Sequence, residues 1–226
     1  LKKKGVKVEA KASVQKITGI PGEMTVTYTD KKGAEHTVTA QGVLAAAGRK
    51  ANLDGLFGPD FSLELDRGAV VGDDMGRTSV PHVYVIGDAK AKNIQLAHVA
   101  SAQGENVVAV IAGKNPPLDL SVVPSCVYTE PEIASVGLTE EGAKAAGIPV
   151  KTGKYLTGAN GKCLIEGTES GYVKLVTDGA SGRILGAQLV CPRATDMVGE
   201  LTLAIQKGLT ADDLSAVIHP HPPFSE

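Results

Sequence analysis

The sequence predicts an α/β region followed by an α+β region with an antiparallel sheet. Residues 43–47 and 83–86 are continuous apolar runs, which are typical of strands buried on both faces of a sheet. A helical pattern over residues 95–112 follows the second run, as in an α/β unit. Further along, residues 172–176 and 184–190 flank a Gly-containing turn and predict an antiparallel hairpin.

The first fifty residues predict mainly strands. Residues 6–10 alternate between apolar and polar side chains, and the pattern continues loosely to Ile17. Residues 24–29 and 36–40 alternate as well, and the turn at residues 30–33 joins them into a hairpin.

Residues 50–77 are rich in Gly, Asp and Leu, and we interpret them as a connection between domains. The next predicted strand ends in Gly87 and Asp88, where glycine lets a backbone approach closely and the carboxylate can accept hydrogen bonds from a ligand hydroxyl. The following helix would direct the N–H groups of its first residues at the same ligand. An ordinary strand–loop–helix unit with a surface aspartate is the alternative. The predicted apolar stripe of the helix consists of Val107, Val108 and Ile111.

The second region is expected to begin near Asp119, after a linker at residues 115–117. Thr139 is predicted to cap a helix, and Thr210 resembles the start of a capping box before another short helix. The other predicted elements are strands at residues 126–129 and 133–136 and a helix with an apolar face of Val198, Leu201 and Ile205.

The last eight residues place two imidazoles between prolines and end on a carboxylate. In an extended segment His219 and His221 project from the same face, and the prolines make the segment stiff. Glu226 can curl back, accept a hydrogen bond from one ring nitrogen and leave the other to take a proton, which is the arrangement of a general base. A metal-binding or merely polar tail is the alternative.

The composition limits the kinds of partner. The 226 residues are 42% hydrophobic with a net charge of −2, which suits a packed core and argues against nucleic acid or a membrane surface as the main partner. No apolar run approaches the roughly 20 residues that span a bilayer. Cys126, Cys163 and Cys191 are far apart and odd in number, which favours core positions in a reducing compartment. We expect a bacterial cytoplasm, with the mitochondrial matrix as an alternative. Leu1 opens the chain without a leader pattern, so we expect part of a longer protein.

Segments in a fixed order resemble the pyridine nucleotide–disulfide oxidoreductases, a family of flavoenzymes. Residues 44–52 are similar to the end of the family's NAD domain, and residues 78–88 with 96–100 and 103–104 resemble its second FAD motif. Residues 128–137 resemble the opening of its interface domain, and the terminal His-Glu run resembles its catalytic dyad. The paired His-x-His-Pro before Ser-Glu is most similar to the dihydrolipoyl dehydrogenase branch, although Pro223 stands where the family has Thr.

The resemblance implies a fold and three domains. Residues 1–75 would be the C-terminal part of the NAD-binding domain with a connection, and residues 76–117 the C-terminal segment of the FAD-binding domain. Residues 118–226 would be the dimerisation (interface) domain. The fold class would then be an α/β remnant of two nucleotide-binding domains followed by an α+β interface domain.

The resemblance also implies residue roles. Asp88 would bind the ribityl chain of FAD, and the helix start would meet the pyrimidine edge of the flavin. His221 would take a proton from a dihydrolipoyl thiol, Glu226 would orient it, and His219 is treated as loop structure. The peptide between His221 and Pro222 is expected to be cis. The implied cofactor-binding residues are Gly48, Arg49, Gly87, Asp88, Leu96, Ala97 and His98, and no metal site is expected.

The family also uses a Cys-x-x-x-x-Cys pair and two Gly-rich phosphate loops, which this sequence lacks. We therefore expect the C-terminal half of an enzyme that oxidises protein-bound dihydrolipoamide through FAD and NAD, inactive and without tightly bound cofactor on its own. The expected partners are a second subunit, whose flavin the dyad reaches, and the lipoyl domain of a 2-oxoacid dehydrogenase or glycine-cleavage complex. The alternatives are a glutathione-reductase-like enzyme, a non-catalytic dimerisation module, or a metal protein using His219, His221 and Glu226.

Overall fold

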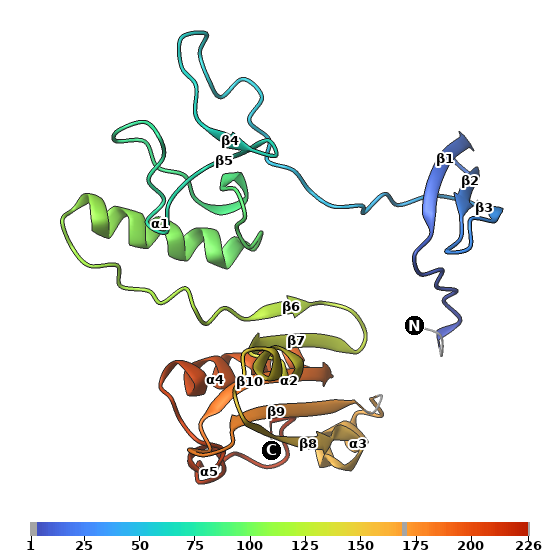
Figure 1. Cartoon of the computed structure of the whole chain (residues 1–226). Coiled ribbons are helices and arrows are strands. Elements are labelled where there is room, and N and C mark those ends of the chain that lie inside the picture. The colour runs from blue at the N-terminus through green and yellow to red at the C-terminus, as the bar shows by residue number, and fades with distance from the viewer. Residues whose placement is uncertain (1–3, 169–170, 226) are drawn as a thin grey trace. The chain divides into compact units, whose positions relative to one another are not determined.

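The computed structural model describes residues 4–168 and 171–225, which fall into two compact units, residues 1–50 and 51–226 (Figure 1). The N-terminal unit is a three-stranded antiparallel meander. Its strands follow one another in the sheet as β1 (Ser13–Ile20), β2 (Glu23–Thr29) and β3 (Glu35–Ala40). The β2–β3 hairpin confirms the predicted one. Asp30 closes its turn, because one carboxylate oxygen accepts hydrogen bonds from the N–H groups of Lys32 (2.8 Å) and Ala34 (3.0 Å).

Two strand predictions for this unit are wrong. Residues 6–10 form no strand, and β1 begins only at Ser13, after Lys11 turns the chain with a left-handed φ of 60°. Residues 43–47 belong to no sheet, and Leu44 is 90% exposed. A strand buried on both faces needs hydrogen-bonded neighbours, and none of the strands in the described part of the chain pairs with this run.

The first part of the second unit is irregular apart from one long helix. β4 (Leu65–Asp66) pairs with β5 (Ala69–Val70), a 3₁₀ turn η2 covers Gly87–Ala89, and α1 spans Ala97–Ile111. The helix confirms the one predicted over residues 95–112.

The inner face of α1 differs from the predicted stripe. Val107 is buried as predicted, but Val108 and Ile111 are 65% and 61% exposed. The remaining buried positions of the helix carry Val99 and two amide side chains, Gln103 and Asn106. An apolar pattern alone misplaces this face because half of its buried residues are polar.

The apolar run at residues 83–86 is not a strand of a sheet, which corrects a second buried-strand prediction. Tyr84 forms an isolated antiparallel bridge with Arg77, and the N–H of Val85 donates to the carbonyl of Gly76 at 2.8 Å. A Cβ on Gly76 would lie 2.9 Å from the carbonyl oxygen of Val85, so this close pass of two backbones requires glycine. Val85 is buried, which explains its apolar character without a surrounding sheet.

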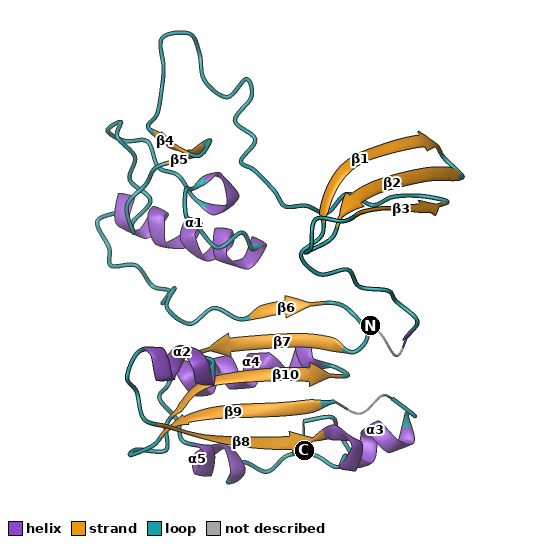
Figure 2. Cartoon of the chain, turned by 45° about the vertical axis from the view of Figure 1, so that its right-hand side comes forward, coloured by secondary structure: helices purple, strands orange, loops and turns teal. Residues whose placement is uncertain are grey.

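The second part of this unit is a five-stranded antiparallel sheet in the order β6-β7-β10-β9-β8, whose strands lie side by side in Figure 2. The hairpin β9–β10 and the strands β6 and β7 confirm the predictions for these segments. β8 has no predicted counterpart, because Lys151, Gly153 and Lys154 interrupt its apolar pattern. The bounds are β6 (Ser125–Val127), β7 (Glu132–Gly137), β8 (Val150–Leu156), β9 (Tyr172–Asp178) and β10 (Ile184–Cys191).

Short helices accompany the sheet, and two of their predicted caps are confirmed. The hydroxyl of Thr139 accepts a hydrogen bond from the N–H of Gly142 at 3.0 Å, and Thr210 forms a reciprocal capping box with Asp213. The bounds are α2 (Glu140–Ala145), η3 (Thr157–Ala159), α3 (Gly161–Ile165), α4 (Ala194–Gln206) and α5 (Ala211–Ser215).

The hydrophobic core lies where α4 packs on β7 and β10. Val198 and Leu201, both on the predicted apolar face, are 3% and 7% exposed. Each buried side chain of this size contributes roughly 1.5–3 kcal/mol relative to an exposed one. The other members are Ala134, Val136, Ala187, Leu189, Cys191 and Ala194.

The cysteines take core positions, as predicted. Cys163 and Cys191 are 3% and 1% exposed, and Cys126 packs against the core cluster. Burial raises the pKa of the Cys191 thiol to about 11, so this sulfur stays protonated and unreactive at neutral pH.

The first prediction concerns Gly186 in β10. A Cβ at this position would overlap the carbonyl oxygen of Leu138, and backbone cannot move aside cheaply. We expect Gly186→Ala to lower the free energy of unfolding by about 3 kcal/mol in urea titrations. Gly153→Ala in β8 is the matched control, because a Cβ there meets no atom within 4 Å. Equal effects of the two substitutions would contradict the crowding at Gly186.

The second prediction concerns Glu140, which ties α2 to β9. Its carboxylate accepts hydrogen bonds from Lys144 (2.7 Å) and Lys174 (2.6 Å), and these two lysines lower the pKa of Glu140 to about 2 from a usual 4.5. Because the folded-state pKa is the lower one, the stabilisation is full above about pH 4.5 and disappears as the pH falls towards 2. We expect Glu140→Gln to destabilise the protein at pH 7, with a difference from wild type that shrinks across this window. Urea titrations at stepped pH measure it, and Glu141→Gln serves as the control.

Candidate functional site

The turn at Gly87 lies unusually close to α1. Gly87 is buried with a left-handed φ of 62°, and a Cβ added to it would come within 2.8 Å of the Cβ of Ala100. A larger residue would be both strained and crowded, so glycine is what allows this approach. Asp88, the next residue, is half-buried.

A buried amide, Gln103, holds this turn in place. Its Oε1 accepts hydrogen bonds from the N–H of Gly87 (2.8 Å) and from Nδ2 of Asn93 (3.2 Å), and its Nε2 donates to Oδ1 of Asn93 (2.8 Å). Asn93 Nδ2 also donates to the carbonyl of Gly87 at 2.8 Å. The turn, the loop after it and the helix therefore form one hydrogen-bonded network, which fixes the position of Asp88 relative to α1.

The N-terminus of α1 has no side-chain cap. Leu96 occupies the N-cap position, so the N–H groups of Ala97 and His98 have no partner within the helix. The helix dipole makes this end electropositive. His98 Nε2 donates to the carbonyl oxygen of Pro124 at 2.9 Å, which ties the helix start to the segment before β6.

The structure thus brings the predicted residues Gly87, Asp88, Leu96, Ala97 and His98 to the N-terminal end of α1. Gly87 lies against Ala100, which is one helical turn from Leu96. A carboxylate next to an electropositive helix end suits a ligand that carries both hydroxyl groups and an anionic or electron-rich edge. A flavin dinucleotide has this chemistry, so the residues present fit it.

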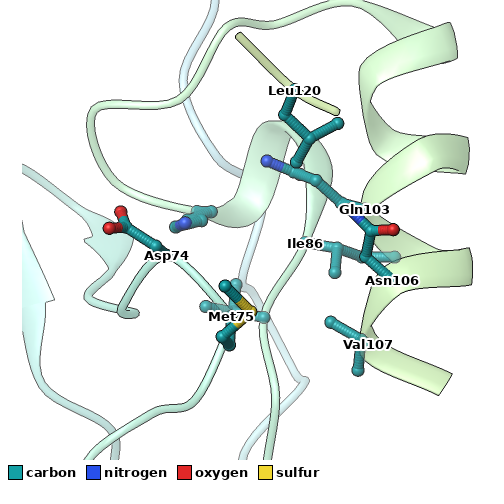
Figure 3. Close-up of a pocket in the computed structure, with 10 residues that line it drawn as sticks. Asp74, Met75, Ile86, Gln103, Asn106, Val107 and Leu120 are labelled. Carbon is teal, nitrogen blue, oxygen red and sulfur yellow. The ribbon is translucent and has the colours of Figure 1, made fainter. Parts of the chain in front are cut away.

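A narrow cavity beside the turn is not the ligand site (Figure 3). Met75, Ile86, Gln103 and Asn106 are among the side chains that line it. Its volume of about 10 Å³ is at the lower limit for a single water molecule.

Gly48 and Arg49 lie in the N-terminal unit. Both are exposed on the chain that follows β3, and Gly48 has a left-handed φ of 126°. Their role in cofactor binding stays a prediction.

The C-terminal segment lies beside β8 and α3 (Figures 1 and 2). His221 is exposed, and the peptide between His221 and Pro222 is cis, which confirms that expectation. The segment borders a cavity of about 630 Å³, whose lining includes Tyr155, Met197, Glu200, Leu214, His219 and Phe224. Glu226 lies outside the described residues, so the predicted dyad stays a prediction.

The metal-site alternative gains nothing from this geometry. Within residues 4–168 and 171–225, no three His, Cys, Asp or Glu side chains gather in a way that could hold a metal ion. Over the same residues, no helix has the length and apolar character to cross a membrane.

Sequence reasoning placed Gln103 in the second FAD motif without assigning its hydrogen bonds, and it missed Asn93, Glu200 and Asn160 as structural partners of the candidate residues. Gln103 left a usable signal, because it lies four residues from Val99 and four from Val107, at a position that the helical period assigns to the interior. The other three residues are linked to the site only by tertiary contacts.

Comparisons with known proteins agree with this arrangement. The family model for pyridine nucleotide-disulphide oxidoreductase matches residues 1–104, and the model for the dimerisation domain of the same family matches residues 123–226. The chain belongs to the pyridine nucleotide–disulphide oxidoreductase family, whose members are flavoprotein disulfide oxidoreductases.

Among the most similar curated relatives are dihydrolipoyl dehydrogenases. The chain is 40% identical to one from Bacillus subtilis over 228 residues and 39% identical to one from Geobacillus stearothermophilus over 227 residues, in both cases over 100% of its own length. It spans about half of these relatives, 48% of each.

Solved structures confirm the fold. LpdA from Mycobacterium tuberculosis superposes with a TM-score of 0.87 at 26% identity, covering 99% of this chain and 48% of that one. The HOCl-induced flavoprotein disulfide reductase RclA from Escherichia coli gives 0.84 at 22% identity, covering 95% and 48%, which shows a shared fold alone.

The third prediction tests the amide network. Gln103→Leu removes three of its hydrogen bonds and leaves the N–H of Gly87 without its partner, so we expect a loss of about 2–3 kcal/mol in unfolding free energy. Hydrogen exchange at residues 85–93 should accelerate before any global opening. Ser101→Ala, on the exposed side of the same helix, should change neither quantity. Unchanged exchange at Gly87 in the Gln103 variant would refute the role of this network.

Proposed function

We propose that this chain supplies the C-terminal half of a dihydrolipoyl dehydrogenase, which oxidises protein-bound dihydrolipoamide to lipoamide and passes the electrons through FAD to NAD. The observation that carries the proposal is 40% identity over the whole chain to an enzyme of that name. A terminal segment with two histidines and three prolines supports it, because the segment presents an exposed imidazole on a stiff backbone.

FAD, when bound, would supply a two-electron acceptor. On this chain, the Asp88 carboxylate would accept hydrogen bonds from ribityl hydroxyls, and the backbone at Leu96, Ala97 and His98 would meet the pyrimidine edge. The electropositive start of α1 favours negative charge at that edge. Gly48 and Arg49 are proposed to serve the NAD side.

His221 is proposed as the base. Oxidation of the dithiol to a disulfide releases two protons and two electrons, and a ring nitrogen of His221 takes the first proton from a substrate thiol. The thiolate that remains is the nucleophile, and it would attack the disulfide of the Cys-x-x-x-x-Cys pair in the other half of the enzyme, which is thereby reduced and passes the two electrons to FAD. Glu226 accepts from the other ring nitrogen, which orients the ring and stabilises the imidazolium.

A second copy of the chain is the proposed partner that completes the site. Ile218 lies immediately before residues 219–223, the histidine segment, and is 97% exposed; Val217 is 53% exposed. Burial of these side chains against another subunit would remove apolar surface from water, as the match to a dimerisation domain suggests. We place the dyad of one subunit against the flavin of the other, and a lipoyl domain of a 2-oxoacid dehydrogenase or glycine-cleavage complex as the source of substrate, in a bacterial cytoplasm.

The sequence contains neither the Cys-x-x-x-x-Cys pair nor the Gly-rich phosphate loops of the family. We therefore propose that the chain alone holds neither cofactor tightly and has no turnover. Its contribution becomes measurable only in combination with the half that carries these groups.

The fourth prediction uses a chimera in which residues 1–226 replace the matching half of the Bacillus subtilis dihydrolipoyl dehydrogenase. We expect a yellow dimer that reduces NAD with dihydrolipoamide and is inactive with glutathione disulfide. His221→Gln should lower kcat by about 10²–10⁴-fold with the flavin retained, because general base catalysis is removed. His36→Gln, at an exposed histidine of β3 outside these motifs, is the control. A dimeric, flavin-bound chimera without dihydrolipoamide activity would overturn the proposal in favour of a non-catalytic module.

A further inference from the structure

We propose that His219 and Asn160 are positioning residues that hold His221 from both sides. The proposal rests on the proposed function only in taking His221 as the base. The contacts of His219 with Glu200 and Val217 form an upstream anchor, and the contact of Asn160 with Pro223 forms a downstream anchor. In the chain, His221 lies midway between His219 and Pro223.

The upstream anchor joins the segment to α4. His219 Nε2 lies 3.0 Å from Oε1 of Glu200, and Nδ1 lies 3.0 Å from the carbonyl oxygen of Val217. A carboxylate and a carbonyl only accept hydrogen bonds, so a ring N–H is the donor in either contact, and the tautomer decides which nitrogen carries it. The His219 side chain is only 22% exposed, so the ring is held against α4 rather than in open solvent.

The downstream anchor uses the two ends of one buried amide. Asn160, 3% exposed, caps α3 through Oδ1, which accepts from the N–H of Cys163 at 3.0 Å. Its Nδ2 donates to the carbonyl oxygen of Pro223 at 3.1 Å. The same side chain therefore fixes the start of α3 and the end of the histidine segment.

Between the anchors the backbone has little freedom. Pro220, Pro222 and Pro223 each have a ring-restricted φ and also restrict the ψ of the residue before them, so most of the backbone torsions between residues 219 and 223 are limited. With both ends held, the backbone position of His221, whose ring is exposed, follows from contacts at both ends of the segment. A general base needs this kind of fixed geometry, because a displacement of about 1 Å can cost 10²-fold in rate.

The fifth prediction is tested by nitrogen-15 NMR of the histidine rings in the 226-residue chain at pH 7. We expect Glu200→Gln to release the His219 ring and to increase the fast motion of the His221 ring at least twofold in relaxation measurements. In Asn160→Ser, which keeps a capping hydroxyl, the His219 signals should be unchanged while the His221 ring gains the same mobility.

Asp196→Asn is the matched control, since it removes an exposed carboxylate of α4 that contacts Arg193 and not the histidine segment. It should leave both histidines as in the wild type. A His221 ring with unchanged mobility in both variants would overturn the proposal. If Asn160→Ser unfolds α3, Glu200→Gln still decides the outcome.

The same variants in the chimera separate the anchors from the proposed function. We expect Glu200→Gln to lower kcat about 10-fold with KM unchanged, and Asp196→Asn to change neither. An inactive chimera whose isolated chain shows the expected NMR result would refute the proposed function and keep the anchors. An active chimera that is insensitive at position 200 would refute the anchors and keep the function.

Discussion

The packing of α4 on β7 and β10 is the contact on which the other features of the sheet region depend. Val198 on this interface is 3% exposed, and Gly137 and Gly186 allow neighbouring backbones to approach without a side chain between them. A close-packed interior transmits position, so the helix cannot shift without disturbing the sheet. Glu200 and Asp196 lie on its exposed side, and the contact of Glu200 with His219 attaches the end of the chain to this helix.

The region around α1 is organised by amides rather than by strands. Gln103 bonds the backbone of Gly87, and Asn106 forms two hydrogen bonds with the backbone of Leu118 at 2.8 and 2.9 Å. These side-chain contacts satisfy buried backbone groups before and after the helix, as hydrogen bonds between strands do in a sheet. The position of the turn at Asp88 therefore depends on one side chain in the middle of a helix.

Local signals account for what the sequence predicted well. The turns of the hairpins, the caps at Thr139 and Thr210 and the stiffness of the proline segment depend on residues a few positions apart. The run at 83–86 misled because Val85 is buried without being part of a sheet, and a strand also needs hydrogen-bonding neighbours. The run at 43–47 has no paired strand and is exposed.

The partners of the candidate site depend on contacts between distant residues, which no local pattern reveals. Asn160 and Pro223 are 63 positions apart, and Glu200 and His219 are 19 apart. Gln103 is the exception, because the helical period places this polar residue at an interior position, where it needs a hydrogen-bond partner.

The position of His219 between two acceptors has a consequence for inheritance. A replacement there must still present a hydrogen-bond donor, and a replacement at Glu200 without an acceptor atom leaves a ring nitrogen of His219 without this partner. The two codons are therefore expected to vary together among descendants of this protein. Such linked variation would let a set of related genes report on the backbone that carries His221.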